Sequence, residues 1–256
     1  QWAAKTKADI IVLCGVHFMG ETAKILCPDK KVLVPDLNAG CSLADSCPAT
    51  EFAEFVKQHP GHTVISYVNT TAAVKAVTDV VVTSTNARQI VESFPEGTPM
   101  IFGPDRNLGN YINSITGRNM LLWDGACHVH EQFSLEKILS LKKQYPNAEV
   151  ITHPECKQPV IQVSDFVGST AALLKHTIKS DAKQFIVATE SGVIHEMRKR
   201  SPDKEFIPAP PNDSTCACNE CNFMRLNTME KLYNCLKFEM PEIFVDEEVQ
   251  KKAIKP

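Results

Sequence analysis

Short apolar runs alternate with amphipathic stretches along most of the chain. The apolar runs are rich in Val and Ile and occur at residues 9–13, 31–35, 63–68, 100–103, 149–153 and 185–188. Their length and their β-branched residues predict strands. Between them, as at residues 51–59 and 135–145, apolar residues recur every three or four positions, which predicts amphipathic helices. Alternating strands and helices indicate an α/β fold with helices on both faces of parallel sheets.

The chain also contains an internal repeat with an offset of 86 residues. Between residues 41 and 84, ten of the 44 positions hold the same residue as the position 86 further along. Average residue usage would give about two or three identities by chance. Cys41 falls on Cys127, and Asp79 falls on Asp165. Duplication of one αβα unit is the simplest explanation of this pattern.

The same strand and helix pattern opens the chain and leads to Cys41, and a later copy leads to Cys221. We therefore expect three homologous αβα units whose parallel sheets surround a pseudo-threefold axis. The expected units are residues 1–41 with the C-terminal tail 222–256, residues 42–127, and residues 128–221. The first unit lacks the front half of the other two, so we expect it to be N-terminally incomplete by about 40–60 residues.

Composition narrows the classes of function. The 43% hydrophobic and 22% charged residues are typical of a globular fold and exclude a disordered chain. The net charge of -3, without a basic block, argues against binding to nucleic acid. No apolar run approaches the roughly 18 residues that span a bilayer, so we expect no membrane segment. Ten cysteines are too few for a disulfide scaffold of this length, which favours reduced thiols and a cytoplasmic location.

Three cysteines follow predicted strands. Ligand sites in parallel α/β folds collect at the carboxyl ends of strands, where loops converge. Cys41, Cys127 and Cys221 each lie at such an end, so three thiolates from three units could meet near the axis and bind one metal centre. Two alternatives stay open. In the first, Cys41 and Cys127 are only buried packing residues; in the second, the three cysteines of segment 216–221 form a zinc half-site that Cys235 or a histidine completes.

Side chains that can transfer protons lie near these cysteines. His130 follows a candidate ligand by three residues, and His153 and Glu155 lie at i and i+2 after a predicted strand. An imidazole and a carboxylate on one face of an extended chain can act as general acid and base. At the offset of 86, this pair corresponds to Tyr67 and Asn69, which are also polar.

Hydroxyl side chains precede two predicted helices. Ser84 lies before one of them, and Ser169 and Thr170 lie before the other. Such residues ordinarily cap the helix, and the free backbone N–H groups beside them can also bind an anion. The chain contains neither a G-x-G-x-x-G segment nor a Walker-type loop, so a dinucleotide or a nucleoside triphosphate is not indicated.

Seven segments together resemble a known family. They are CGVHFMGETA (14–23), PDLNAGC (35–41), YVNT (67–70), TSTNA (83–87), PDRNLG (104–109), WDGACHVH (123–130) and HPEC (153–156). On these segments the chain resembles the quinolinate synthase family, the iron-sulfur enzymes of de novo NAD biosynthesis. The resemblance covers residues 8–245.

The resemblance implies a cofactor and a reaction. Three similar domains would surround a 4Fe-4S cluster held by Cys41, Cys127 and Cys221, and the iron without a protein ligand would act as a Lewis acid. The implied reaction condenses iminoaspartate with dihydroxyacetone phosphate to quinolinate, with loss of phosphate and water. An aspartate-oxidising enzyme is the implied functional partner.

The resemblance also implies roles for the side chains. Glu155 would be the general base, and His153 and Tyr67 would position it or relay protons. The implied substrate contacts are Asn69, Ser84, His130, His153, Glu155, Ser169 and Thr170. Cys216 and Cys218 would be left to form a redox-active pair. Two other classes compete with this interpretation: a non-enzymatic iron-sulfur or zinc redox-sensing module, and an iron-sulfur hydro-lyase that acts on a small hydroxy acid.

Overall fold

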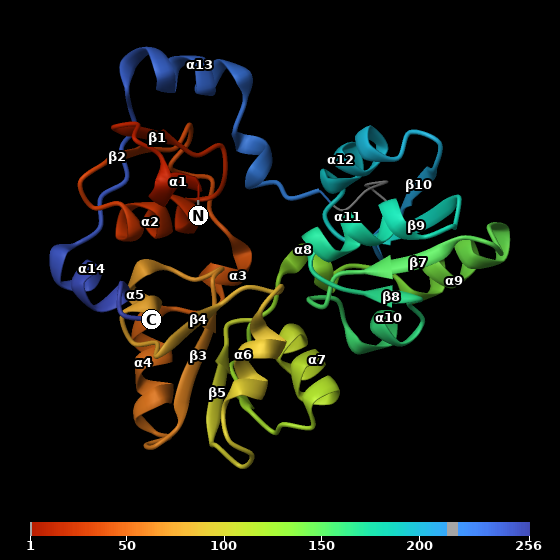
Figure 1. Cartoon of the computed structure of the whole chain (residues 1–256), viewed down its shortest axis with the longest axis horizontal. Helices are drawn as coiled ribbons and strands as arrows, with labels where there is room; N and C mark the ends of the chain where they lie inside the picture. Colours follow the sequence, from red (N-terminus) through yellow and green to blue (C-terminus); the bar gives the residue numbers. More distant parts are fainter. Residues whose placement is uncertain (1, 214–219) are drawn as a thin grey trace.

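The strands of the chain pair in parallel, as the alternating pattern predicts. The computed structural model describes residues 2–213 and 220–256 (Figure 1). Within these residues, ten strands form one two-stranded and two four-stranded sheets. The prediction of an α/β fold with three parallel sheets is confirmed.

The strands are divided among the sheets in chain order. The first sheet contains β1 (Ile10–Val12) and β2 (Lys31–Leu33). The second sheet contains β3 (Thr63–Tyr67), β4 (Val80–Val82), β5 (Met100–Gly103) and β6 (Leu121–Leu122). The third sheet contains β7 (Glu149–Thr152), β8 (Phe166–Val167), β9 (Gln184–Ala188) and β10 (Glu205–Pro208).

The second and third sheets have the same topology. Their strand orders are β4-β3-β5-β6 and β8-β7-β9-β10, so each strand of one sheet has a counterpart at the same place in the other. The repeated Asp explains part of this likeness. Asp79 accepts a hydrogen bond from the N–H of Val64, and Asp165 accepts one from the N–H of Val150, both at 2.8 Å. In each sheet this carboxylate joins the loop before the edge strand to the central strand.

Helices connect the strands and cover the sheets. They are α1 (Trp2–Lys5), α2 (His17–Leu26), α3 (Ser42–Asp45), α4 (Ala49–Lys57), α5 (Ala72–Lys75), α6 (Ala87–Ser93), α7 (Arg106–Thr116), α8 (His128–Glu131), α9 (Leu135–Gln144), α10 (Gln158–Gln162), α11 (Thr170–Lys179), α12 (Val193–Arg200), the 3₁₀ turn η1 (Met224–Leu226), α13 (Met229–Phe238) and α14 (Glu247–Ala253). None of the helices in the described ranges is long and apolar enough to cross a bilayer.

The C-terminal segment returns to the first sheet. The N–H of Ile243 donates to the carbonyl of Val32 at 2.8 Å, and Glu242 forms an antiparallel bridge with Leu33. Further along, α14 packs against α5, so the end of the chain lies between the first two sheets (Figure 1). Residues far apart in sequence therefore complete the surroundings of β1 and β2.

The loop that carries Cys127 is packed too closely for a side chain at Gly125. A Cβ there would lie 2.5 Å from the carbonyl oxygen of Pro104 and 2.5 Å from Oγ of Ser46. We therefore expect Gly125→Ala to lower the free energy of unfolding by about 1–3 kcal/mol, because an overpacked site must displace backbone. Urea denaturation measures this change.

The matched control for that substitution is Gly40→Ala. A Cβ at Gly40 would meet the ring of Phe223 at 3.4 Å, which is an ordinary contact. This variant should unfold at nearly the urea concentration of the unsubstituted chain. Equal stability of the Gly125 and Gly40 variants would show that the loop before Cys127 adapts to a side chain.

Candidate functional site

A cavity of about 320 Å³ lies where loops from all three sheets converge. Cys41 follows the last strand of the first sheet, Cys127 follows the last strand of the second, and Cys221 follows the last strand of the third. All three residues line this cavity. It therefore occupies the place where parallel α/β folds bind ligands, at the carboxyl ends of strands.

Most of the residues selected from the sequence line the same cavity. Besides the three cysteines they are Tyr67, Asn69, His130, His153, Glu155 and Thr170. Tyr67 is the last residue of β3, and His153 follows β7 directly, so the equivalent strands of two sheets deliver side chains to one place. Two of the selected residues, Ser84 and Ser169, do not line the cavity.

Ser84 and Ser169 do not line the cavity, but each lies next to a residue that does: Tyr67 and Thr170. The expectation that Ser84 caps a helix is wrong, because α6 has Asn86 at its N-cap. Ser84 instead lies beside the hydroxyl of Tyr67, whose pKa it lowers, and Tyr67 lines the cavity. Ser169 is the N-cap of α11, where its Oγ accepts from the N–H of Ala172 at 3.3 Å. It thereby fixes the first turn of the helix that begins with Thr170.

Glu155 is at the centre of a buried group of polar side chains. The hydroxyl of Tyr67 donates to its Oε1 at 2.8 Å. Nδ1 of His130 lies 3.1 Å from its Oε2, and Nδ1 of His153 lies 3.6 Å from its Oε1. The exposed fractions of Glu155, His153 and His130 are 3%, 3% and 7%. At such depth, charge–charge interactions are only weakly screened by solvent.

The charges in this group determine its protonation. Burial raises the pKa of Glu155, but the neighbouring charges of His130 and His153 and the hydrogen bonds outweigh it and lower the pKa to about 2. Burial lowers the pKa of His130, yet the carboxylate of Glu155 raises it above its ordinary value. Burial lowers the pKa of His153 to about 4. Near neutral pH Glu155 is therefore ionised and His153 is neutral, and the carboxylate of Glu155 favours the protonated form of His130.

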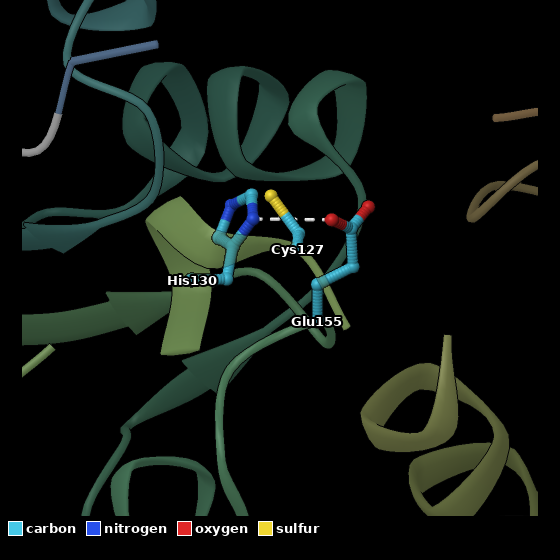
Figure 2. A group of neighbouring side chains, drawn as sticks. All are labelled: Cys127, His130 and Glu155. Atoms are coloured by element: carbon cyan, nitrogen blue, oxygen red, sulfur yellow. Dashed lines mark ion pairs between the residues drawn. The ribbon is translucent and has the colours of Figure 1, made fainter. Parts of the chain in front are cut away.

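The cavity also presents a set of donors that suits a metal. Figure 2 shows Cys127, His130 and Glu155, whose ligand atoms all lie within 4.8 Å of one another. Burial raises the pKa of Cys41 to about 12 and raises that of Cys127 further. These thiols stay protonated unless a cation replaces their protons, as a metal does when it binds thiolates. Three cysteines around one cavity fit an iron-sulfur centre, because thiolates are the usual ligands of such clusters.

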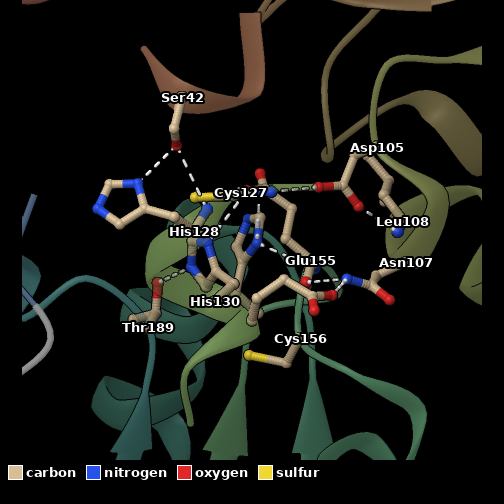
Figure 3. Close-up of polar contacts among 12 residues, drawn as sticks. Ser42, Asp105, Asn107, Leu108, Cys127, His128, His130, Glu155, Cys156 and Thr189 are labelled. Atoms are coloured by element: carbon tan, nitrogen blue, oxygen red, sulfur yellow. Dashed lines mark hydrogen bonds and ion pairs between the residues drawn. The ribbon is translucent and has the colours of Figure 1, made fainter. Parts of the chain in front are cut away.

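Two cysteine loops are joined directly through the residues that follow the cysteines. Nδ1 of His128 lies 2.6 Å from Oγ of Ser42, and the N–H of His128 donates to the same oxygen at 3.3 Å (Figure 3). Ser42 follows Cys41 and His128 follows Cys127, at the offset of 86 found in the repeat. The contact therefore holds the first and second cysteine loops together.

The expected zinc half-site and the expected redox-active pair both depend on cysteines of segment 216–221. Cys216 and Cys218 lie outside the described residues, so neither a zinc half-site with Cys235 nor a redox-active pair is described. Cys235 itself is buried in α13 with an exposed fraction of 1%. It is not among the residues that line the cavity.

Several side chains in and beside the cavity are not among the site residues that the sequence predicts. Thr189 and Glu190 follow β9 and line the cavity, and Oγ1 of Thr189 lies 3.2 Å from Nε2 of His130. Asn107 donates to the carbonyl of Glu155 at 3.0 Å (Figure 3). One sequence feature does point to Glu190: it closely follows a predicted strand, as other candidate site residues do. No sequence pattern indicates the contact of Asn107.

The fold and the site define a parallel α/β protein with thiols and an acid–base group around one cavity. The family model described as "Quinolinate synthetase A protein" matches residues 1–256. The chain belongs to the quinolinate synthase family and is therefore an enzyme of that family. The family resemblance seen in the sequence is confirmed.

Individual relatives agree with the family match. The quinolinate synthase of Thermosynechococcus vestitus is 58% identical over 254 residues, which are 99% of this chain and 80% of the relative. That of Chloroherpeton thalassium is 57% identical over 254 residues, 99% of this chain and 79% of the relative. That of Synechocystis sp. is 57% identical over 256 residues, 100% of this chain and 80% of the relative.

Proposed function

We propose that this enzyme condenses iminoaspartate with dihydroxyacetone phosphate to form quinolinate, with loss of phosphate and water. The observation that carries the proposal is the single cavity lined by Cys41, Cys127 and Cys221 together with Tyr67 and Glu155. Such a reaction needs a site that binds carboxylate and phosphate groups and moves several protons. Family membership favours this reaction over a redox-sensing module and over an iron-sulfur hydro-lyase.

The three cysteines would hold a 4Fe-4S cluster. When bound, the cluster would supply one iron without a protein thiolate, which can act as a Lewis acid toward a hydroxyl or carbonyl oxygen. A single metal ion held by Cys127, His130 and Glu155 is the competing arrangement, because their ligand atoms lie within 4.8 Å of one another. The two arrangements differ in whether Cys41 and Cys221 are needed.

The polar group would carry out the proton transfers. The carboxylate of Glu155 raises the pKa of His130 and so favours its protonated form, and the pair could donate a proton to one group and accept one from another. The hydroxyl of Tyr67 keeps the carboxylate in place. His153, neutral in this surrounding, can accept a proton from a nearby substrate group.

Other side chains would bind and orient the substrates. Asn69 and Thr170 line the cavity and offer hydrogen bonds to carboxylate or phosphate oxygens. Ser84 and Ser169 would act through their contacts with Tyr67 and with the first turn of α11. We also propose the division into three units around a pseudo-threefold axis, a cytoplasmic location, and an aspartate-oxidising enzyme as the source of the imine.

The direct experiment incubates the purified chain, kept under argon, with the two substrates. We expect quinolinate and inorganic phosphate to appear in equal amounts. Addition or removal of water on a small hydroxy acid, without quinolinate, would instead identify a hydro-lyase. No product from either set of substrates by an iron-loaded chain would contradict the proposal.

Tyr67→Phe tests the contact with Glu155. The variant keeps the ring and loses the hydroxyl that donates to the carboxylate at 2.8 Å. A hydrogen bond to a charged group contributes about 1.5–3 kcal/mol, so we expect kcat to fall roughly 10- to 100-fold with a smaller change in KM. Steady-state kinetics measure this split. Tyr111→Phe, on α7 and outside the residues that line the cavity, is the control and should keep normal rates.

A further inference from the structure

Two carboxylates occupy the same place in the second and third sheets. The carbonyl of Phe102 in β5 accepts from the N–H of Trp123, and the carbonyl of Val187 in β9 accepts from the N–H of Ala209, both at 2.9 Å. Phe102 and Val187 are therefore equivalent in register. The third residue after each is acidic: Asp105 in one sheet and Glu190 in the other.

Each carboxylate bonds the cysteine of its own sheet. Oδ2 of Asp105 accepts from the N–H of Cys127 at 3.2 Å (Figure 3). Oε1 of Glu190 accepts from the N–H of Cys221 at 3.3 Å. The other oxygen of each carboxylate accepts from the start of the next helix, from Leu108 at 2.7 Å and from Gly192 at 2.8 Å.

We propose that Asp105 and Glu190 are a repeated pair of positioning residues that fix the backbone of Cys127 and Cys221 so that both thiols face one bound metal centre. The inference rests on the proposed function, because it takes these cysteines as metal ligands. The first sheet differs. β1 is followed by Leu13, Cys14 and Gly15, so the first sheet has no acidic residue at the corresponding place that could bond Cys41.

Helix capping alone does not account for a carboxylate at position 105. Asp105 is fully buried, with an exposed fraction of 0%, and burial raises the pKa of its carboxyl to about 8, so ionising it at this place costs free energy. Asn caps a helix about as well as Asp and carries no charge. The advantage of the carboxylate is its second acceptor oxygen, since an amide presents one oxygen and one NH₂ group. The N–H of Cys127 uses that second oxygen.

Two substitutions test this pair of carboxylates. Asp105→Asn and Glu190→Gln keep the size of the side chain and one acceptor oxygen, so each can still bond the helix. Each loses the acceptor for the cysteine N–H. Asp79→Asn is the matched control, because Asp79 also accepts from a backbone N–H but lies at the opposite end of its sheet. Glu190 is partly exposed, so its variant keeps the test open if Asp105→Asn does not fold.

The experiment combines amide hydrogen exchange, read by mass spectrometry, with the rate at which a chelator removes iron from the reconstituted full chain. We expect Asp105→Asn to speed exchange about three- to tenfold in the segment that contains Cys127, and to leave the segments with Cys41 and Cys221 unchanged. Glu190→Gln should do this only for Cys221. Both variants should lose iron severalfold faster than the Asp79→Asn control.

The outcomes separate this proposal from the proposed function. Unchanged exchange at both cysteines, or equal acceleration at all three, would overturn the positioning role even if the chain binds iron and forms quinolinate. Cysteine-specific acceleration in a chain that binds no iron would support the hydrogen-bonding role and overturn the metal centre. Faster exchange at the expected cysteine together with faster iron loss supports both.

Discussion

Glu155→Gln is expected to lower kcat by about 10²- to 10⁴-fold, the usual contribution of a general acid–base group. The amide still accepts from the hydroxyl of Tyr67 but cannot take up a proton, and it leaves His130 without its anionic partner. The pKa of His130 then falls, because the carboxylate of Glu155 is the largest of the charges that raise it. Both members of the proton-transferring pair are therefore lost in one substitution.

The control for this substitution is Glu131→Gln. Glu131 is partly buried, whereas Glu155 is fully buried; the carboxylate of Glu131 contacts Asn107 at 2.6 Å and Arg106 at 3.1 Å, but it does not line the cavity. The Glu131 variant should keep kcat within a few-fold. Metal analysis of both variants completes the test. Normal turnover by Glu155→Gln would remove Glu155 from the chemistry, and loss of metal from it would favour the site made by Cys127, His130 and Glu155.

Cys127→Ser is expected to lose most of its bound iron and all measurable quinolinate formation, and Cys41→Ser and Cys221→Ser are expected to do the same. Serine does not replace a thiolate as a ligand of iron-sulfur clusters, whose irons are held by cysteine sulfur. All three residues line one cavity, so removal of any one leaves the centre with two protein ligands. Iron content and product formation, measured side by side, check this expectation.

Cys14→Ser is the control for the cysteine substitutions. Cys14 is exposed and does not line the cavity, so its replacement should leave iron and activity unchanged. The competing single-ion site makes a different prediction: Cys127→Ser loses the metal, whereas Cys41→Ser and Cys221→Ser keep it. Retention of iron by either of those two variants would contradict a three-thiolate centre.

The sequence is sufficient to predict the layered topology because residues that make the same contacts in two sheets recur at the offset of 86. Asp79 and Asp165 are identical at the offset of 86, and each bonds the central strand of its sheet in the same way. The alternation of apolar runs and amphipathic stretches predicts the parallel α/β class because the inner strands, such as β5 and β9, are buried between helices and are therefore apolar along their length. Helix ends are predicted less well: the pattern predicts a helix over residues 51–59, whereas α4 begins at Ala49 and ends at Lys57.

Contacts between loops of different units are beyond prediction from one sequence. Tyr67 and Glu155 are both identifiable as strand-end residues, but their 2.8 Å hydrogen bond depends on how two sheets pack together. The expected capping role of Ser84 failed because a neighbouring residue, Asn86, takes the N-cap position. The bond between Glu190 and Cys221 joins residues 31 apart in the chain, and no local sequence pattern indicates such a contact.

The most direct test of the proposed centre is the content of iron, acid-labile sulfide and zinc in the anaerobically purified chain. Three thiolates around the cavity predict about four irons and four sulfides per chain, with little zinc. One zinc or one iron per chain without sulfide would contradict the cluster and indicate a single-ion site instead.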